Sequence, residues 1–378
     1  MYFDYNATSP LRPHARDAMI DAMKYVGNPT SVHTYGRTVR GHIESTREVL
    51  ASIFHTSPKN VIFTSGATEA NNMVIQNHVG PVLISAIEHD SVYAVRDDVH
   101  IIRATNEGVL DLDHLEEILT ALKDSENPPL IAILAAHNET GVIQPIEDVL
   151  KIAEKHKALT HIDAVQSFCK TTQSYKGATT VAVSAHKIGG PAGVGALIKT
   201  DGFYPKPLIR GGGQERSFRS GTENILGIVG FGAAITAALR DDQRCIQEKR
   251  DRFEAAFKQI SPDVVVFGEH SPRLPGTSNF AMPHTKSEVM LMHFDQKGMA
   301  VSSGAACSSG KVKVSRSLLA MGIPESIAKG AVRISIGYQT TDQEIDALIH
   351  AWGDIDAKIS PSKPHSQSLE EAPCHVAA

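Results

Sequence analysis

Short apolar runs alternate with longer amphipathic stretches between about residues 58 and 240. The runs are rich in β-branched residues and predict strands at 61–64, 82–85, 100–103, 130–136, 159–163, 181–184 and 194–198. Helices are predicted from residue 69, after residue 89, at 146–156 and at 223–239. Such alternation is typical of a parallel sheet with helices on both faces. We therefore expect an α/β fold built on a mostly parallel, seven-stranded sheet.

The chain on either side of this alternation has a different pattern. Residues 1–12 form an extended arm, and helices are predicted at 13–25 and 36–54. After residue 240 the sequence predicts a smaller α+β region, with helices to residue 260, at 288–297 and at 342–352, and a strand at 264–267. The tail has no apolar periodicity. We predict three parts: a large domain at 13–240, a small domain made of 1–12 and 241–359, and a disordered tail at 360–378.

The composition is that of a globular, slightly acidic protein. Of 378 residues, 42% are apolar and 21% are charged, and the formal net charge of -5 lacks the basic surplus of a nucleic-acid-binding protein. The four cysteines have no C-x-x-C spacing, which argues against zinc or a disulfide framework. The chain has no apolar run of membrane-spanning length and begins without a signal-peptide pattern. We expect a cytoplasmic protein that binds neither nucleic acid nor membranes.

A lysine follows the predicted strand at 181–184. Lys187 stands three residues after Ser184, and Gly189, Gly190 and Pro191 then turn the chain. The amine is therefore expected at the carboxyl edge of the sheet, where α/β proteins bind ligands. A desolvated lysine there can form a Schiff base. Taken alone, a lysine after a strand is more often a surface residue.

Polar groups also follow four other predicted strands. They are a glycine-containing turn ahead of a helix, an acid, a histidine and two amides, at Ser65-Gly66-Ala67-Thr68-Glu69, Asp163, His89, Asn138 and Gln166. The turn suits a phosphate but also an ordinary helix cap, and the acid suits a ring nitrogen but is also common at a strand end. The histidine suits stacking on a planar ring but is also common in loops. Only their coincidence with a lysine matches the requirements of pyridoxal phosphate.

From Tyr2 to about Trp352 the chain resembles the cysteine desulfurases of the NifS/IscS type, within the class V, fold type I pyridoxal-phosphate enzymes. The resemblance rests on the site motifs above and on Asp4-Tyr5-Asn6-Ala7-Thr8, Gly27-Asn28-Pro29, Asn138-Glu139-Thr140-Gly141, Ser184-Ala185-His186-Lys187, Gly211-Gly212-Gly213-Gln214-Glu215, Arg219-Ser220-Gly221-Thr222-Glu223-Asn224 and Ser302-Ser303-Gly304-Ala305-Ala306-Cys307. It implies a fold type I transferase, with a large cofactor-binding domain and a small domain that carries a catalytic cysteine loop.

The resemblance implies roles around the cofactor ring. Lys187 would hold the cofactor as a Schiff base, and Asp163 would pair with the pyridinium nitrogen. His89 would stack on the ring and exchange protons, while Asn138 and Gln166 would contact the ring face or its phenolic oxygen. Asn138 is also expected to contact the substrate.

The resemblance also implies a phosphate site. Ala67, Thr68, Ser184 and His186 would hold the phosphate of the same chain, and Thr222 would reach the phosphate of a partner subunit. The implied assembly is a homodimer. The residues themselves show only a glycine-rich loop around Thr222.

Two further residues complete the candidate site. Cys307 lies among small residues and near Lys311 and Lys313, which would favour its thiolate, although a passive loop cysteine also fits this pattern. Cys169, Cys245 and Cys374 lie in less suitable surroundings. Arg333 stands on an apolar strand and resembles the family's clamp for the substrate carboxylate; the alternative is an ion pair with a protein carboxylate.

The implied reaction converts L-cysteine to L-alanine and leaves the sulfur as a persulfide on Cys307, for iron-sulfur cluster assembly or other thio-cofactors. A sulfur-acceptor or iron-sulfur scaffold protein is the expected partner. The alternatives are a selenocysteine lyase, another class V aminotransferase and a non-catalytic sulfur-assembly scaffold. A dinucleotide-binding dehydrogenase fits poorly, because no G-x-G-x-x-G follows the first strand of the alternating region.

Overall fold

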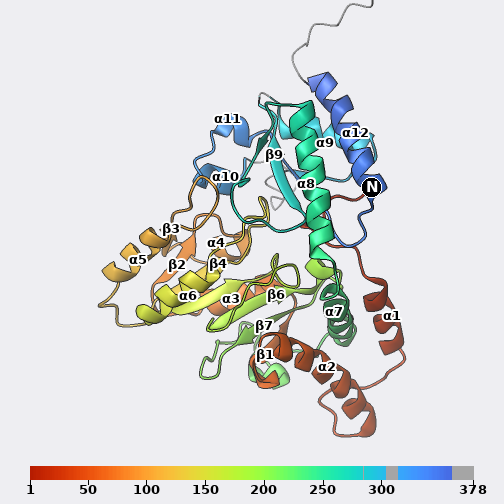
Figure 1. Ribbon diagram of the computed structural model, residues 1–378. Coiled ribbons are helices and arrows are strands. Elements are labelled where there is room, and N and C mark those ends of the chain that lie inside the picture. The colour runs from red at the N-terminus through yellow and green to blue at the C-terminus, as the bar shows by residue number, and fades with distance from the viewer. Residues whose placement is uncertain (284, 304–313, 360–378) are drawn as a thin grey trace, which may run out of the picture.

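The computed structural model describes residues 1–283, 285–303 and 314–359. Two β-sheets organise it, a larger one toward the lower half of Figure 1 and a smaller one, marked by β9, at the upper centre. Cys307, Lys311, Lys313, Cys374 and the predicted disordered tail lie outside the described residues. None of the described helices combines the length and the apolarity needed to span a bilayer.

The large sheet has seven strands in the order β1-β7-β6-β5-β4-β2-β3. Their bounds are β1 Val61–Thr64, β2 Val82–Ser85, β3 Val99–Ile102, β4 Leu130–Leu134, β5 Leu159–Asp163, β6 Thr180–Ser184 and β7 Gly195–Lys199. Strand β7 pairs antiparallel with both of its neighbours, and the remaining pairs are parallel. The predicted mostly parallel, seven-stranded sheet is therefore confirmed.

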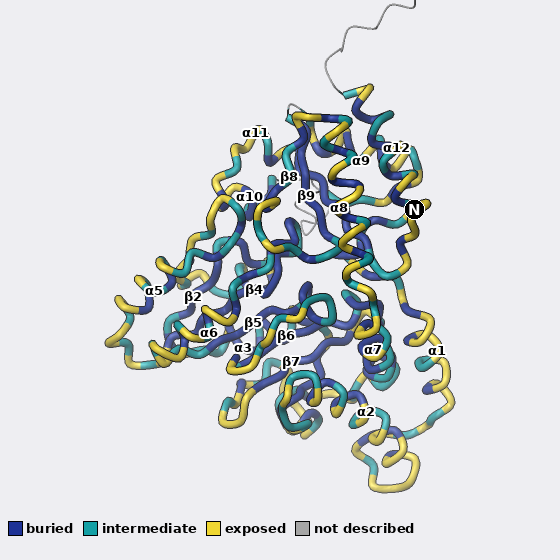
Figure 2. The backbone as a smooth tube through the Cα atoms, viewed as in Figure 1, coloured by how far each residue is buried: buried dark blue, intermediate teal, exposed yellow. Residues whose placement is uncertain are grey.

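Helices cover both faces of the large sheet, because its central strands are apolar on both sides. In β4, Ile131 and Ile133 enter one core cluster, while Leu130 and Ala132 enter another. Five helices pack on the first cluster: α1 Pro13–Ala22, α2 Thr34–Ile53, α5 Leu112–Ala121, α6 Ile146–Lys155 and α7 Ile225–Ala238. Two helices pack on the second: α3 Ala67–Ile75 and α4 Asp90–Tyr93. Figure 2 shows the strands of this sheet as a buried layer between partly exposed helices.

Two helices beside the large sheet differ from the sequence prediction. The helix expected after His89 is a single turn, α4, which packs Val92 and Tyr93 against the apolar core. Helix α5 was not predicted, although its buried Leu115 and Leu119 recur at helical spacing. Both segments precede or follow strands of the parallel series, so the fold class is unaffected.

The small sheet is antiparallel, with the order β10-β11-β9-β8. Its strands are β8 Val265–Val266, β9 Thr277–Ala281, β10 Ser302–Ser303 and β11 Ala331–Ser335. On one face lie α8 Gln243–Ile260, α9 Ser287–Gln296 and α12 Asp342–Ile359, around Trp352, whose ring stacks 4.6 Å from that of Phe257. On the other lie α10 Arg316–Ala320 and α11 Glu325–Ala328. Strand β9 was not predicted, because three of its five residues are polar although all are buried.

The large and small sheets have separate core clusters. Ile235 and Ala238, at the end of α7, belong to the large core, while Ile246 and Phe253 of α8 belong to the small one. This change supports a boundary near residue 240, which we retain as a proposal.

The N-terminal arm runs between the two sheets. The amide of Phe3 donates to Ala300, and its carbonyl accepts from the amide of Ser335 in β11. Farther along, the amide of Ser9 donates to the carbonyl of His186, and that of Arg12 to Gly189. The arm therefore joins the small sheet to the turn that carries Lys187.

Candidate active site

A pocket of about 430 Å³ opens at the carboxyl ends of the large sheet. Its walls come from the residues that follow β1, β2, β4, β5 and β6, and β11 of the small sheet adds one side chain. Ten residues predicted for the site line it: Ala67, Thr68, His89, Asn138, Asp163, Gln166, Ser184, His186, Lys187 and Arg333. The volume suits a small-molecule ligand. The structure thus brings these residues together, while their roles stay predictions.

Lys187 lies in a short 3-10 helix, Ala185–Ile188, directly after β6. Gly189 ends this turn at a φ of +80°, and a Cβ there would lie 2.6 Å from the side chain of Arg12, so only glycine fits. The Lys187 Nζ donates to the carbonyls of Asn6 at 2.6 Å and Ala7 at 2.9 Å. The amine therefore points back across the pocket toward the N-terminal arm.

Asp163, the last residue of β5, is held by two donors. Its Oδ2 accepts from the side-chain amide of Asn71 at 2.8 Å, and its Oδ1 from the amide of Val165 at 3.0 Å. The Oδ1 of Asn71 in turn accepts from Nε2 of His161 at 2.9 Å. Burial lowers the pKa of His161 to about 3, so this imidazole is neutral and has its proton on Nε2. The carboxylate is thereby fixed in one orientation.

His89 caps α4 and is part of the same network. Its Nδ1 accepts from the amide of Ser91 at 3.0 Å, and the Ser91 hydroxyl lies 2.8 Å away. That hydroxyl accepts from the side-chain amide of Asn71 at 2.8 Å, so its own proton is directed at Nδ1. A neutral His89 therefore carries its proton on Nε2. Asn71 and Ser91 were missed by the sequence analysis. The available signal was the position of Asn71, which shares the buried face of α3 with Ala67, Ala70 and Val74.

The predicted phosphate turn begins α3. Ala67 and Thr68 line the pocket at the helix N-terminus, where free backbone amides favour an anion. A Cβ at Gly195 would lie 2.8 Å from the Cα of Gly66, so glycine lets β7 approach this turn closely. The ordinary capping alternative is present as well, because Glu69 accepts from the amide of Ser65 at 2.8 Å.

Ser184 and His186 approach the pocket from the lysine turn. Burial, with the charges of Lys187 and Lys170, lowers the pKa of His186 to about 4. A neutral imidazole contributes a hydrogen bond and no charge. Thr222 is exposed and does not line the pocket of its own chain.

Arg333 reaches the pocket from β11 and is 2% exposed. Its Nη1 donates to the carbonyl of Asn138 at 2.9 Å, and its Nη2 to one oxygen of Asp4 at 2.6 Å. The Nε has no partner among the described residues. The alternative considered from the sequence, an ion pair with a protein carboxylate, is therefore present, although the guanidinium also faces the pocket. Asp4 was not predicted as its partner.

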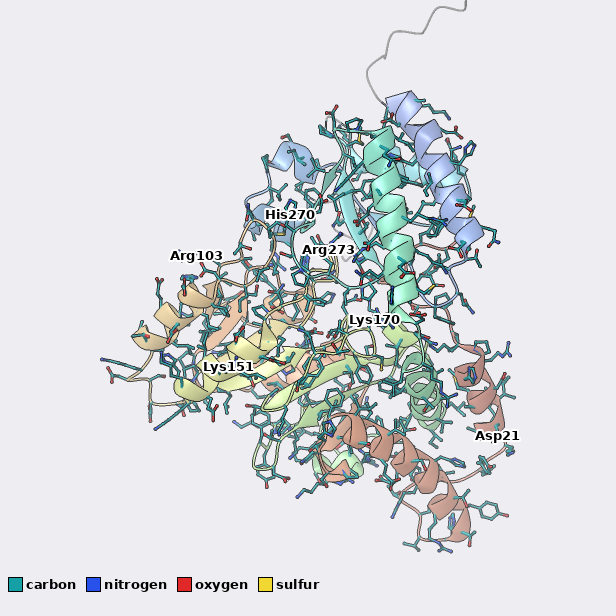
Figure 3. All side chains as sticks on the ribbon, viewed as in Figure 1. Asp21, Arg103, Lys151, Lys170, His270 and Arg273 are labelled. Carbon is teal, nitrogen blue, oxygen red and sulfur yellow. The ribbon has the colours of Figure 1, made fainter. Side chains whose placement is uncertain are left out.

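Gln166 lines the pocket, and a second lysine, Lys170, contacts it from outside the lining. The Gln166 side chain donates to the carbonyl of Asn6 at 3.0 Å and accepts from Lys170 at 3.4 Å. Figure 3 shows Lys170 below α8, where the two sheets meet. Burial, with the charge of Lys187, lowers the pKa of Lys170 to about 7.

A buried carboxyl lies beside the site. Glu88, next to His89, is 1% exposed and accepts from the amide of Leu134 at 2.9 Å. Burial raises the pKa of Glu88 well above its ordinary value, and the nearby charge of Asp163 raises it further. Burial therefore favours the protonated form of Glu88.

Neither described cysteine lines the pocket. Cys169 is mostly buried, and this burial raises the pKa of its thiol to about 12, which makes it a poor nucleophile. Cys245 lies in the first turn of α8.

Comparisons with known proteins find relatives along almost the whole chain. The family model for aminotransferase class-V matches residues 1–348. Cysteine desulfurase IscS of Dictyoglomus turgidum is 36% identical, with 97% of each chain covered. The NifS-like protein of Rickettsia africae superimposes with a TM-score of 0.87 at 35% identity, covering 94% of this chain and 99% of that one. A structure of SspA in complex with cysteine gives a TM-score of 0.78 at 28% identity, covering 90% and 99%.

The fold, the pocket at its strand ends and the near-complete overlap with these relatives lead to one classification. The chain belongs to the aminotransferase class-V family and, within it, to the cysteine desulfurases.

Proposed function

We propose that this protein is a cysteine desulfurase, which converts L-cysteine to L-alanine with pyridoxal phosphate and passes the sulfur to Cys307. The observation that carries the proposal is one pocket with the Lys187 amine, the fixed Asp163 carboxylate and the Arg333 guanidinium on its walls. A lysine for a covalent bond, an acid for a ring nitrogen and a cation for a substrate carboxylate are the groups this reaction requires. The cysteine bound to the similar SspA supports L-cysteine as the substrate.

The residues present fit pyridoxal phosphate. The start of α3, with the Thr68 hydroxyl and nearby Ser184, suits its phosphate, and Asp163 suits its ring nitrogen. Lys187 would hold the cofactor covalently, and His89 would lie against the ring. When bound, the cofactor supplies an electron sink for the carbanion formed at the substrate Cα. Asp163 would keep that sink effective by holding its negative charge beside the ring nitrogen.

The chain's own groups account for the remaining steps. Arg333 would bind the substrate carboxylate, and the Lys187 amine would accept the proton from Cα. The Cys307 thiolate would then attack the substrate sulfur, so that an S–S bond forms while the Cβ–S bond breaks. The electron pair of the broken bond stays on carbon, and protonation completes the methyl group of alanine. His89, with a proton on Nε2, is positioned to assist proton transfer.

We further propose a cytoplasmic homodimer in which the exposed Thr222 contacts the phosphate bound by the partner subunit. The persulfide sulfur would pass to an acceptor or scaffold protein, for iron-sulfur cluster assembly or another thio-cofactor.

Borohydride reduction followed by peptide mapping tests the cofactor site. The reduced cofactor is expected on Lys187, and Lys187→Ala should lose both this modification and alanine formation from L-cysteine without added keto acid. Lys170 is the matched comparison, because it is a second poorly solvated amine near Gln166. A modified Lys170, or alanine formation that requires a keto acid, would contradict the proposal.

The sulfur-transfer step has a separate test. Cys307→Ser should still exchange the Cα proton of L-cysteine, because Lys187 and Asp163 are unchanged, but it should form no persulfide. Cys169→Ser is the control, since its buried thiol has a raised pKa and lies off the pocket. Mass spectrometry that located the extra sulfur on Cys169 or Cys245 would overturn the role of Cys307.

A further inference from the structure

Asn6, in the N-terminal arm, contacts both sheets and the candidate site. Neither the strand pattern nor the proposed roles assign it a function. It is 4% exposed and lines the pocket that holds Lys187. Its position is set from both sides, since the neighbouring arm residues bond to β11 and to the lysine turn.

The main-chain carbonyl of Asn6 accepts two hydrogen bonds from site residues. One comes from the Lys187 Nζ at 2.6 Å and the other from the side-chain amide of Gln166 at 3.0 Å. A carbonyl oxygen has two lone pairs, so these two donors use its full capacity. The adjacent carbonyl of Ala7 accepts a second bond from the same amine at 2.9 Å. Together the two carbonyls form an acceptor pair for Lys187.

The rest of Asn6 fixes this carbonyl against the small sheet. Its main-chain amide donates to the Ser335 hydroxyl at 2.9 Å, and its side-chain amide donates to the Thr277 hydroxyl at 2.9 Å. Thr277 and Ser335 are directly paired across β9 and β11, so two neighbouring hydroxyls hold one residue. Each bond is buried, where a lost partner is costly.

The same side chain extends the connection to the substrate clamp. The Asn6 side-chain amide also donates to the carbonyl of Asn138 at 3.1 Å, which accepts from Arg333 as well. Asn6 therefore bonds directly to the Lys187 amine and shares the carbonyl of Asn138 with the Arg333 guanidinium. A shift of Asn6 would move both groups relative to the pocket.

We propose that Asn6 is a positioning residue for Lys187: its carbonyl, with that of Ala7, is the docking place of the amine whenever this amine is not covalently bound to the cofactor. Thr277 and Ser335 hold that docking place still. This inference rests on the proposed function, in which Lys187 leaves and regains its covalent bond in every turnover. A released lysine without such acceptors would sample many rotamers and return more slowly.

The test measures the reactivity of Lys187 in the cofactor-free, full-length protein. Trace labelling with ¹³C-formaldehyde and cyanoborohydride, read by peptide mass spectrometry, reports how available each lysine amine is. Thr277→Val keeps the side-chain shape but removes the hydroxyl that holds Asn6, so Lys187 labelling should rise about fivefold, the ratio expected for one hydrogen bond. Thr277→Ser restores the hydroxyl and should label like the wild type.

Thr46→Val is the matched control, because it also removes a buried threonine hydroxyl, one that donates to Ile228 in the large domain. It should leave Lys187 labelling unchanged. The inference is overturned if Thr277→Val labels like the wild type, if Thr277→Ser fails to restore protection, or if Thr46→Val raises labelling equally. Since no cofactor is present, this result is independent of the borohydride mapping that tests the proposed function.

Discussion

Both halves of the molecule bury arginines, and one from each half shows two different uses of a buried guanidinium. Arg47, on α2 beside the large sheet, is 3% exposed, and Arg333, on β11 of the small sheet, is 2% exposed. Burying a guanidinium is unfavourable unless its donors find acceptors. The two guanidinium groups find different acceptors. A guanidinium whose donors are mostly used by the protein has a structural role, whereas one with spare donors can bind a ligand.

Arg47 uses every nitrogen on acceptors of the protein. Its Nε donates to Glu44, and its two Nη atoms bind both oxygens of Glu215 at 2.7 and 2.8 Å. Nη1 also donates to the carbonyl of Val61, and Glu215 accepts from the amide of Phe63. Burial by itself lowers the pKa of Arg47, but the hydrogen bonds and charge of Glu215 raise it above its ordinary value. Four of the five N–H groups of Arg47 are thus used on protein acceptors, and each nitrogen donates at least once.

Arg333 is satisfied only in part. It contacts a single oxygen of Asp4 and one main-chain carbonyl, and its Nε has no partner among the described residues. It also lines the pocket, whereas Arg47 does not. A buried cation with spare donors beside a cavity is suited to bind an anion. The comparison therefore indicates a structural role for Arg47 and supports the proposed role of Arg333 in substrate binding.

The largest effect is expected for Arg47→Met, which leaves Glu215 buried without its cation. We predict a loss of about 3–5 kcal/mol in the free energy of unfolding, the usual cost of breaking a buried pair. Urea unfolding of the cofactor-free protein measures it, with the exposed Arg244→Met as control. An unfolding free energy within about 1 kcal/mol of the wild type would show that the pair is not structural.

Arg333→Lys should change binding more than stability. An ammonium cannot reproduce the forked donors of a guanidinium, so we expect the KM for L-cysteine to rise about tenfold to a hundredfold. The unfolding free energy should change by less than about 1 kcal/mol, because the lysine can still pair with Asp4. Steady-state kinetics and urea unfolding check both values. An unchanged KM together with a large loss in the free energy of unfolding would show that Arg333, like Arg47, has a structural role.

The Arg333 region also contains a carboxyl that titrates near neutrality. Burial raises the pKa of Glu139 from 4.5 to about 7, against the lowering effects of a hydrogen bond from Ser315 and the charge of Arg333. Below pH 4.5 the group is protonated in both the folded and the unfolded state. Between about pH 4.5 and 7 the unfolded state ionises first, so folding stability is lost across this window.

Glu139→Gln removes that titration. The stability of the variant relative to the wild type should therefore increase from pH 4.5 to pH 7, on the order of 1 kcal/mol. Urea unfolding at three pH values across the window measures the difference. A difference that stays constant with pH would show that folding does not raise the pKa of Glu139.

The smallest effect is expected for Asp4→Asn. Asp4 accepts from Nη2 of Arg333 and is partly exposed, so its charge contributes less than about 1 kcal/mol. In the proposed function it would compete with the substrate carboxylate for this donor. Its neutralisation should lower the KM for L-cysteine about two- to fivefold. Asp17→Asn, at an exposed site on α1, is the control. A higher KM would mean that Asp4 orients the guanidinium instead of competing for it.

The sequence alone determined the fold class and most of the pocket wall. Buried parallel strands read as continuous apolar runs, and polar residues just after them must meet at one edge of the sheet. The strand pattern was therefore sufficient to group Lys187, Asp163 and His89. Strand β9 escaped prediction because tertiary contacts bury its polar residues, as with Ser278 and Asn279.

Only the tertiary structure decided how those groups are held. The contacts of Asn71 with Asp163, of Asp4 with Arg333 and of Asn6 with Lys187 join residues 92, 329 and 181 positions apart. Side-chain periodicity reports which face of an element is buried, but it carries no information about which distant acceptor a donor will meet. Main-chain carbonyls such as that of Asn6 have no sequence signature at all, because every residue has one. The docking place of the lysine amine is therefore visible only once the arm is folded between the two sheets.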